Sequence, residues 1–315
     1  MKMRLKLQDF YCPFPSAVNQ HCEAAWQHTL KWLHLFNFVT DESVYKTLEG
    51  AKYYKLAARI CPNISLEALK IFSDSMLLFF ILDEQSEDAG TNGQPEILEP
   101  QHERLVDILT QAELSKFQTP TELAMRDLGR RLLQLHDTPL PLMLRFAKSV
   151  KEYFEGLRWE ALNHSHGITP DVETYIKMRP FTNGAYLCFD LLQIMDQIAL
   201  PPEVIEYPMV KRLELAANNA ISRANDVLSL EKDINKGHTH NLVLVLQHSH
   251  QLSRQEAVAH VTELHDAEVQ IFIELSAQLP SFGGEIDANL QRYLSSLRAC
   301  VRGLLDWHQD SDRYQ

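Results

Sequence analysis

Two clusters of oxygen-bearing side chains have the types and spacing of metal-binding residues. The first is an acidic segment in which Asp83, Glu84, Glu87 and Asp88 follow an apolar stretch. On a helix, the first and third of these carboxylates share a face with the two preceding phenylalanines. Mg²⁺ prefers carboxylate oxygens, so the cluster predicts a hard-cation site. The simpler alternative is an acidic helix end that enters a solvated loop.

The second cluster places three different oxygen donors along one helical stripe. Asn225, Ser229 and Asp233 are spaced i, i+4, i+8, which covers roughly 12 Å of helix axis. Lys232 falls on the same stripe. An amide oxygen, a hydroxyl and a carboxylate suit Mg²⁺ rather than zinc, and the neighbouring ammonium suits a phosphate. The alternative is the solvated polar face of an amphipathic helix.

The two clusters together are more informative than either alone, because they predict a polyanion clamped by several divalent ions. The chain has 30 Lys+Arg against 42 Asp+Glu, a formal net charge of −12. Metal ions and a few cations can invert that sign locally. The same charge argues against a nucleic acid or an anionic membrane as a partner for the surface as a whole.

The elements that must position these clusters are predicted to be helices. Apolar residues recur at helical spacing along most of the chain, and the 315 residues include only 11 glycines. Ser253 with Glu256 forms a capping-box pattern, and Gly237 fits a helix stop. The segment Ala89–Pro100 is the clearest predicted loop and a candidate lid. We expect one all-α domain over residues 1–315, with about ten or more helices.

Composition also bears on the compartment. The five cysteines are far apart and form no C-x-x-C pair, which favours buried, reduced thiols. No signal-peptide pattern follows the basic N-terminus. The longest apolar run, Met76–Leu82, is far short of the roughly 20 residues that span a bilayer. The prediction is a cytoplasmic protein with no membrane span.

The two oxygen clusters and two further segments together give the chain a resemblance to a known family. It resembles a class I terpene synthase of the microbial single-domain type, as in sesquiterpene cyclases. The acidic cluster resembles the aspartate-rich motif of this family, and Asn225–Asp233 resembles its N-D-x-x-S-x-x-K-E motif. Tyr175–Gly184 resembles the segment that carries the pyrophosphate-sensing arginine. Arg313-Tyr314, six residues after Trp307, resembles the terminal Arg-Tyr pair.

The resemblance implies a helical bundle around a deep apolar cavity, three Mg²⁺ ions and an isoprenoid diphosphate substrate. The implied metal ligands are Asp83, assisted by Glu87 or Asp88, and Asn225, Ser229 and Asp233; the implied diphosphate ligands are Arg179, Lys232, Arg313 and Tyr314. Thr182-Asn183-Gly184 would lie where a helix breaks and turns a carbonyl toward the substrate cation. Asp233 replaces the usual glutamate and Glu84 a frequent second aspartate, which leaves Mn²⁺ open as the metal.

The implied reaction is the ionisation of an allylic diphosphate inside a dry cavity. Aromatic faces stabilise a carbocation by about 1–2 kcal/mol each. Phe79, Phe80 and Trp307 are the candidate aromatic residues, and plain core packing is the alternative for each. Chain length resembles that of sesquiterpene cyclases, so C15 farnesyl diphosphate is the expected substrate, with the C10 and C20 diphosphates as alternatives.

Other functions fit the sequence less well. A chain-elongating prenyltransferase would carry a second aspartate-rich motif, which this sequence lacks. A non-catalytic helical protein that binds diphosphate remains the alternative of another class. The pairs His238/His240 and His248/His250 are spaced i, i+2, which does not bring them together on a helix, so no histidine metal site is expected. Nucleotide-binding glycine motifs are missing, and a monomer and a homodimer both remain open.

Overall fold

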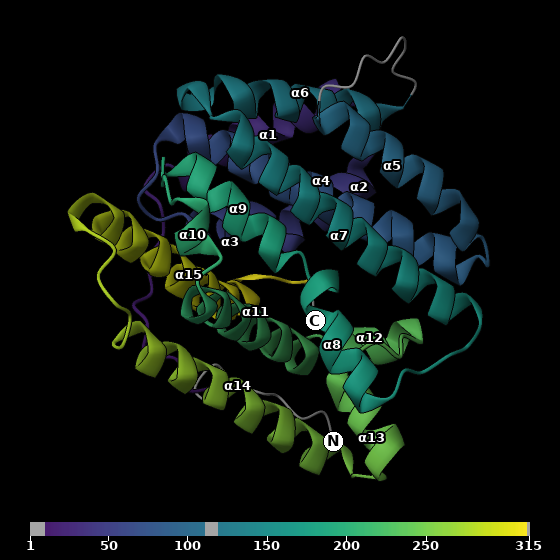
Figure 1. Ribbon diagram of the computed structural model, residues 1–315. Coiled ribbons are helices and arrows are strands. Elements are labelled where there is room, and N and C mark those ends of the chain that lie inside the picture. The colour runs from purple at the N-terminus through teal and green to yellow at the C-terminus, as the bar shows by residue number, and fades with distance from the viewer. Residues whose placement is uncertain (1–9, 111–118, 314–315) are drawn as a thin grey trace.

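The computed structural model describes residues 10–110 and 119–313. The described chain folds into a bundle of α-helices joined by short connections (Figure 1). The helices are α1 (Cys22–Leu35), α2 (Glu42–Ala51), α3 (Tyr53–Ile60), α4 (Leu66–Thr91), α5 (Leu98–Leu109), α6 (Pro120–Gln134), α7 (Leu140–Ser165), α8 (Val172–Thr182), α9 (Ala185–Met195), α10 (Pro202–Ile205), α11 (Pro208–Leu228), α12 (Leu230–Lys236), α13 (Leu242–His250), α14 (Arg254–Ser276) and α15 (Gly284–Asp310). No residue in the described ranges belongs to a β-strand, and the all-α prediction is confirmed.

Two groups of helices face each other across the bundle. Helix α4 packs on α1, α3 and α7, and α11 packs on α14 and α15, as Figure 1 shows. Helix α9 contacts members of both groups, namely α4, α7, α11 and α15. The two predicted oxygen clusters lie at one end of α4 and at the junction of α11 with α12. The packing therefore places them across a shared interior.

Local sequence signals explain several helix ends. Ser253 and Glu256 form the predicted capping box at the start of α14. Gly237 follows α12 with φ 72°, a left-handed conformation that glycine adopts without a Cβ penalty. Asp171 caps α8 by accepting from the backbone N–H of Thr174. The capping box and the Gly237 stop are thus confirmed, and the Asp171 cap is a further local signal that the structure adds.

The predicted loop Ala89–Pro100 is wrong. Helix α4 continues to Thr91, Pro95–Ile97 forms a 3₁₀ turn, and α5 begins at Leu98. Turn-forming residues in this segment shape only a short connection between two helices. Gly90 sits inside α4 because the helix passes close to α7: a Cβ there would lie 2.9 Å from the Ala161 backbone. The segment therefore offers no long flexible lid.

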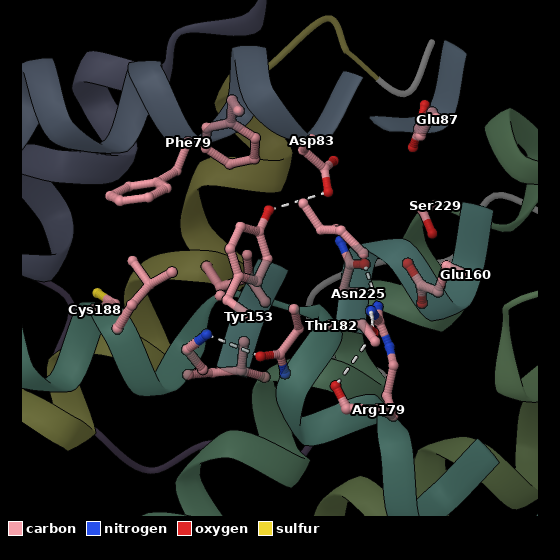
Figure 2. Close-up of a pocket in the computed structure, with 18 of the residues that line it drawn as sticks. Phe79, Asp83, Glu87, Tyr153, Glu160, Arg179, Thr182, Cys188, Asn225 and Ser229 are labelled. Carbon is pink, nitrogen blue, oxygen red and sulfur yellow. Dashed lines mark hydrogen bonds between the residues drawn. The ribbon is translucent and has the colours of Figure 1, made fainter. Parts of the chain in front are cut away.

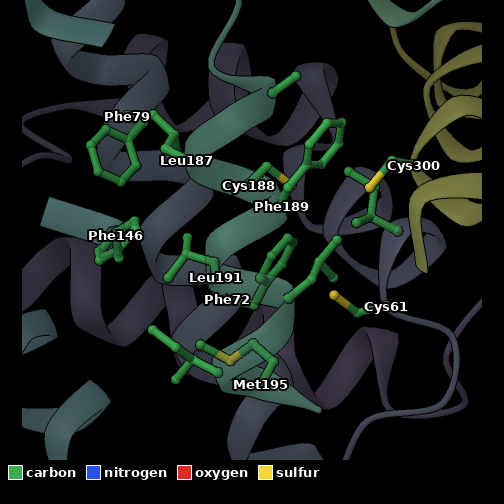
Figure 3. Packing of buried hydrophobic residues seen from close by; sticks show 14 of the residues in the cluster. Cys61, Phe72, Phe79, Phe146, Leu187, Cys188, Phe189, Leu191, Met195 and Cys300 are labelled. Atoms are coloured by element: carbon green, nitrogen blue, oxygen red, sulfur yellow. The ribbon is translucent and has the colours of Figure 1, made fainter. Parts of the chain in front are cut away.

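Most of the apolar core is one continuous cluster that reaches the cavity, and a smaller cluster lies around α13. Figure 3 shows part of the larger cluster, with Phe72, Phe189 and Leu191 packed between α4 and α9. Cys61, Cys188 and Cys300 are buried in this cluster as free thiols, as the sequence predicts. Within the described ranges, no helix is both long and apolar enough to cross a membrane.

Candidate active site

One large cavity, of about 210 Å³, opens between the two groups of helices. Its apolar end is lined by side chains such as Met76, Phe79 and Leu187, and its polar end by acids, amides and cations. Figure 2 shows Asp83 and Glu87 on one side and Asn225 and Ser229 on the other. The two oxygen clusters found in the sequence thus face a common space.

Helix α4 contributes Asp83 and Glu87 to the polar end. Asp83 Oδ1 accepts a hydrogen bond from the Tyr153 hydroxyl of α7 at 3.2 Å. Burial, together with the negative charge of Glu87, raises the pKa of Asp83 to about 7. Burial also opposes ionisation of Glu87, but the positive charges of Lys232 and Lys236 outweigh it and lower its pKa. Two neighbouring carboxyls with opposite pKa shifts therefore face the cavity from α4.

The opposite side of the cavity is built at a break between two helices. Helix α11 ends at Leu228 and α12 begins at Leu230, with Ser229 between them. The sequence predicts one uninterrupted helix here, and the structure corrects that prediction. The cavity is nevertheless lined by all three predicted donors and by Lys232. Backbone hydrogen bonds from Ser229 to Asn225 and from Asp233 to Ser229 continue the helical path across the break.

Arg179 reaches the cavity from α8 and is held by a buried carboxylate. Its Nε and one terminal nitrogen donate to Asp226 Oδ1 at 3.0 and 2.7 Å, and the same terminal nitrogen donates to Asn225 Oδ1 at 2.9 Å. Asp226 is 1% exposed and also accepts from the Tyr175 hydroxyl at 2.8 Å. The planar guanidinium suits several donations at fixed angles. Arg179, a predicted diphosphate ligand, is thereby hydrogen-bonded to Asn225, a predicted metal ligand.

The predicted helix break after α8 is confirmed. Asn183 ends α8, and Gly184 has φ 73° before α9 begins. The Asn183 amide donates to Asn218 Oδ1 at 2.6 Å and to the Ser222 hydroxyl, while its own oxygen accepts from the backbone N–H of Ala185 at 2.8 Å. Side chains of α11 therefore fix the conformation of the break. Thr182, Asn183 and Gly184 all line the cavity.

Close approach of α7 keeps this break against the cavity. A Cβ at Gly156 would lie 2.7 Å from the Phe181 carbonyl oxygen and 3.0 Å from a Thr182 methyl carbon. Only glycine allows such an approach. The backbone at the break therefore packs directly against α7, the helix that contains Tyr153 and Glu160.

Two of the three residues predicted to act near the C-terminus, Trp307 and Arg313, lie within the described part of the chain. Arg313 lines the cavity, lies over the rings of Phe80 and Tyr53 at 5.1 and 5.2 Å, and has a nitrogen 3.3 Å from Glu84 Oε1. The buried Trp307 indole donates to the Ala51 and Lys52 carbonyls and lines the cavity. Tyr314 lies outside the described residues.

The aromatic candidates sit in two places along the cavity. Phe79 packs edge-on against Phe146 and Tyr153 at the apolar end. Phe80 stacks on Tyr53 and lies 6.1 Å from the Trp307 ring, next to Arg313. All three predicted aromatic residues are among those that line the cavity. Their contribution to catalysis stays a prediction.

Asp88 is placed differently from the other predicted metal ligands. Its side chain is exposed, and it is not among the lining residues of the cavity, whereas Glu87 is. A helix turns 100° per residue, so neighbours in the acidic run point in different directions. Glu84 is also exposed and lies beside Arg313. Between the two acids that the sequence left open, the geometry favours Glu87 as the partner of Asp83.

Several cavity residues were not found from the sequence. Tyr153, Glu160 and His164 share one face of α7, and the spacing i, i+7, i+11 is the only signal that could have grouped them. His238 and His240 also line the cavity, since the segment between α12 and α13 is not helical. The helix-based argument that separates these two histidines therefore does not apply. Burial lowers the pKa values of both, to about 4 for His240, which favours the neutral imidazole.

Glu160 is a partly buried carboxyl between Arg179 and the two acids of α4 (Figure 2). Removal from bulk water raises its pKa to about 8, against the opposing influence of Arg179 and Thr182. Because the folded state then binds the proton more tightly than the unfolded state, the stability from this group is lost as pH rises from about 4.5 to about 8. The uncharged isostere Glu160→Gln lacks this loss.

We compare the melting temperature of Glu160→Gln with that of the unchanged protein. The difference, variant minus unchanged protein, is expected to increase between pH 5 and pH 8 and to level off above pH 8. Thermal melts followed by circular dichroism at several pH values measure this difference. A difference that stays constant over the whole range would contradict the assigned protonation state.

The residues present fit a divalent metal. Oxygen donors converge from α4 and from the α11–α12 break, and the carboxyl of Asp83 lies beside that of Glu87. In the part of the chain that is described, no three His, Cys, Asp or Glu side chains meet as a closed metal cage. Mg²⁺ typically keeps several waters and binds one or two carboxylates together with substrate phosphates. An open donor set of this kind is consistent with that behaviour.

Residues 74–270 match the family model described as terpene synthase family 2, C-terminal metal binding. The chain belongs to the terpene synthase family. The matched range contains the part of α4 that carries the acids, the break after α8, and the α11–α12 junction. The matched range therefore includes the predicted metal ligands and Arg179, while Trp307 and Arg313, which also line the cavity, lie beyond it.

Named relatives agree over nearly the whole synthase. It is 34% identical over 304 residues to germacrene A synthase from Nostoc punctiforme, covering 96% of this chain and 94% of the relative. It is 35% identical over 302 residues to (+)-T-muurolol synthase from Roseiflexus castenholzii, covering 96% and 92%. The crystal structure of germacradien-4-ol synthase from Streptomyces citricolor superposes with a TM-score of 0.84 at 25% identity, covering 96% and 99%. The helical bundle of the synthase is thus the fold of this family.

Proposed function

We propose that this synthase ionises farnesyl diphosphate and cyclises the C15 chain to a sesquiterpene, with release of diphosphate. The observation that carries the proposal is a single cavity with oxygen donors from two helices at one end and an apolar aromatic wall at the other. The name of the Roseiflexus castenholzii relative specifies (2E,6E)-farnesyl diphosphate as the molecule it cyclises. This supports C15 over the C10 and C20 diphosphates.

Asp83 and Glu87 would hold divalent ions at one rim, and Asn225, Ser229 and Asp233 at the other. Three Mg²⁺ ions are proposed, with Mn²⁺ as the alternative because of the shorter Asp233 side chain. When bound, the ions neutralise negative charge on the leaving diphosphate. The open arrangement of these donors supports a site that the substrate completes.

The cations of the chain would bind the diphosphate directly. Arg179 and Lys232 line the cavity beside the metal-binding residues, and Arg313 enters from the C-terminal end. Their charges are fixed before ionisation, so little reorganisation is needed as negative charge develops on the leaving group. Asp226 keeps Arg179 in place. Tyr314 is proposed as a further diphosphate ligand.

The apolar end would guide and protect the carbocation. Phe79, Phe80 and Trp307 present ring faces or edges to the cavity, and each correctly oriented face is worth about 1–2 kcal/mol to a cation. Met76 and Leu187 exclude water from the same space. The backbone at Thr182-Asn183-Gly184 would offer a carbonyl dipole to the cation, held by the hydrogen bonds of Asn183 to α11.

Incubation of the purified synthase with C10, C15 and C20 prenyl diphosphates and Mg²⁺ tests the proposal. Gas chromatography–mass spectrometry of the headspace is expected to detect a C15 hydrocarbon or alcohol from farnesyl diphosphate at the highest rate. A higher rate with another chain length would overturn the C15 assignment. Release of no volatile product from any of the three would favour a non-catalytic diphosphate-binding protein.

A further inference from the structure

We propose that Asn241 is a positioning residue that sets the orientation of Asp233 and stabilises the helix break beside it. This proposal rests on the proposed function, in which Asp233 binds a divalent ion. Asn241 lies outside the motifs recognised in the sequence, eight residues beyond Asp233, and precedes α13. Asn241 does not line the cavity, and it acts through Asp233, which does.

Asn241 is fully buried, and both the nitrogen and the oxygen of its side-chain amide form hydrogen bonds. The amide nitrogen donates to Asp233 Oδ2 at 2.8 Å and to the Asp226 carbonyl oxygen at 2.6 Å. The amide oxygen accepts from the backbone N–H of Val243 at 3.0 Å and so caps α13. One side chain therefore connects the start of α13 with a metal-binding carboxylate and with the backbone just before the break.

The hydrogen bond to the Asp226 carbonyl accounts for the break itself. In an uninterrupted helix this carbonyl would accept from the backbone N–H of Leu230. A side chain that inserts into the helical hydrogen-bond ladder is an ordinary cause of a kink. Asn241 donates to the Asp226 carbonyl at the place where α11 ends and α12 begins, so the break does not leave this carbonyl unpaired.

The orientation of Asp233 follows from two donors that reach the same oxygen. The Ser229 hydroxyl donates to Asp233 Oδ2 at 2.6 Å, and the Asn241 amide reaches this atom as well. With Oδ2 held on both sides, the second carboxylate oxygen is left to bind a metal ion. Partners of this kind fix the direction of a ligand, and their loss typically weakens metal binding by about 10- to 100-fold.

The next residue extends the same connection to the diphosphate side. The backbone N–H of Leu242 donates to Asp226 Oδ2 at 3.0 Å, while Oδ1 of that carboxylate holds Arg179. The beginning of α13 therefore supports both a metal ligand and a diphosphate ligand. Shortening residue 241 should disturb the metal ligand first, since the Leu242 contact comes from the backbone.

Asn241→Ser and Asn241→Thr test the proposal. Both substitutes can cap α13, but their side chains are too short to reach Asp233. The matched control is Asn219→Ser in helix α11, which removes an amide-to-carboxylate hydrogen bond of 2.9 Å to Glu268 away from the cavity. Circular dichroism melts establish that each variant is folded.

Calorimetric titration of Mg²⁺ in the presence of inorganic diphosphate gives the binding readout. We expect affinity to fall at least tenfold in both Asn241 variants and to stay within twofold in the control. The Mg²⁺ concentration for half-maximal turnover should rise in parallel, with a smaller change in kcat at saturating Mg²⁺. Unchanged affinity in a folded Asn241 variant would overturn the proposal. Failure of both variants to fold would also overturn it, since Asn241 would then be required for folding rather than for positioning Asp233.

The binding measurement separates this proposal from the proposed function. If the unchanged protein binds Mg²⁺ and diphosphate but releases no terpene from any prenyl diphosphate, the proposed function fails while the comparison of Asn241 variants still decides the role of Asn241. If the unchanged protein does not bind Mg²⁺ with diphosphate, both fail together.

Discussion

Asp83→Ala is expected to lower kcat/KM for farnesyl diphosphate by about 10³-fold, the scale of losing one well-placed electrostatic group in an active site. The physical reason is that Asp83 is the predicted metal ligand of α4 that faces the cavity beside Glu87. Its raised pKa, caused first by burial, shows that the folded protein holds this carboxyl at a cost. We therefore expect the melting temperature to stay the same or to rise.

Asp88→Ala is the matched control, because Asp88 is an exposed carboxylate on the same turn region of α4 and does not line the cavity. Steady-state assays with saturating Mg²⁺ should show near-normal turnover for this variant. If Asp83→Ala keeps more than about a tenth of the activity, or if Asp88→Ala loses as much as Asp83→Ala does, the assignment of the α4 site is wrong.

Arg179→Lys is expected to lower kcat/KM by about 100-fold and also to destabilise the fold. A lysine keeps the charge but is a single point donor, whereas the guanidinium contacts Asp226, Asn225 and the Thr182 hydroxyl at once. Asp226 would stay buried with fewer donors, and an under-paired buried charge typically costs several kcal/mol. Turnover assays and thermal melts measure the two effects separately.

Tyr175→Phe serves as the comparison, since it removes a different donor from the same carboxylate and leaves Arg179 in place. It should lose about 1 kcal/mol of stability and keep activity within a few-fold. Equal losses of activity in the two variants would mean that Arg179 acts only by supporting Asp226, and its role as a diphosphate ligand would be refuted.

Much of the chemistry was visible in the sequence because metal and phosphate sites constrain residue type over short distances. Asn225, Ser229 and Asp233 all line the cavity, as their spacing predicts, although a helix break lies between them. The break at Gly184 was expected from the family resemblance, and the glycine fits it because a left-handed φ favours glycine. The misplaced loop at Ala89–Pro100 shows the limit: packing of α4 on α7 extends a helix through residues that prefer turns.

Contacts between distant segments account for what the sequence could not predict. Tyr153 and Glu160 belong to a helix with no recognisable motif, and only the packing of α7 brings them to the acids of α4. Asn241 likewise reaches Asp233 through the return of the chain into α13.

The sequence by itself determined the helical class and the candidate oxygen donors with Lys232, because helix periodicity and metal-ligand chemistry are local properties of residue order. Arg179 and Arg313 became candidates through the family resemblance. Only the tertiary structure decided which acids face the cavity, how Arg179 is held, and which buried side chains orient the ligands. Those features depend on the packing of segments far apart in the chain, where hydrogen bonds of buried groups must be satisfied across several helices.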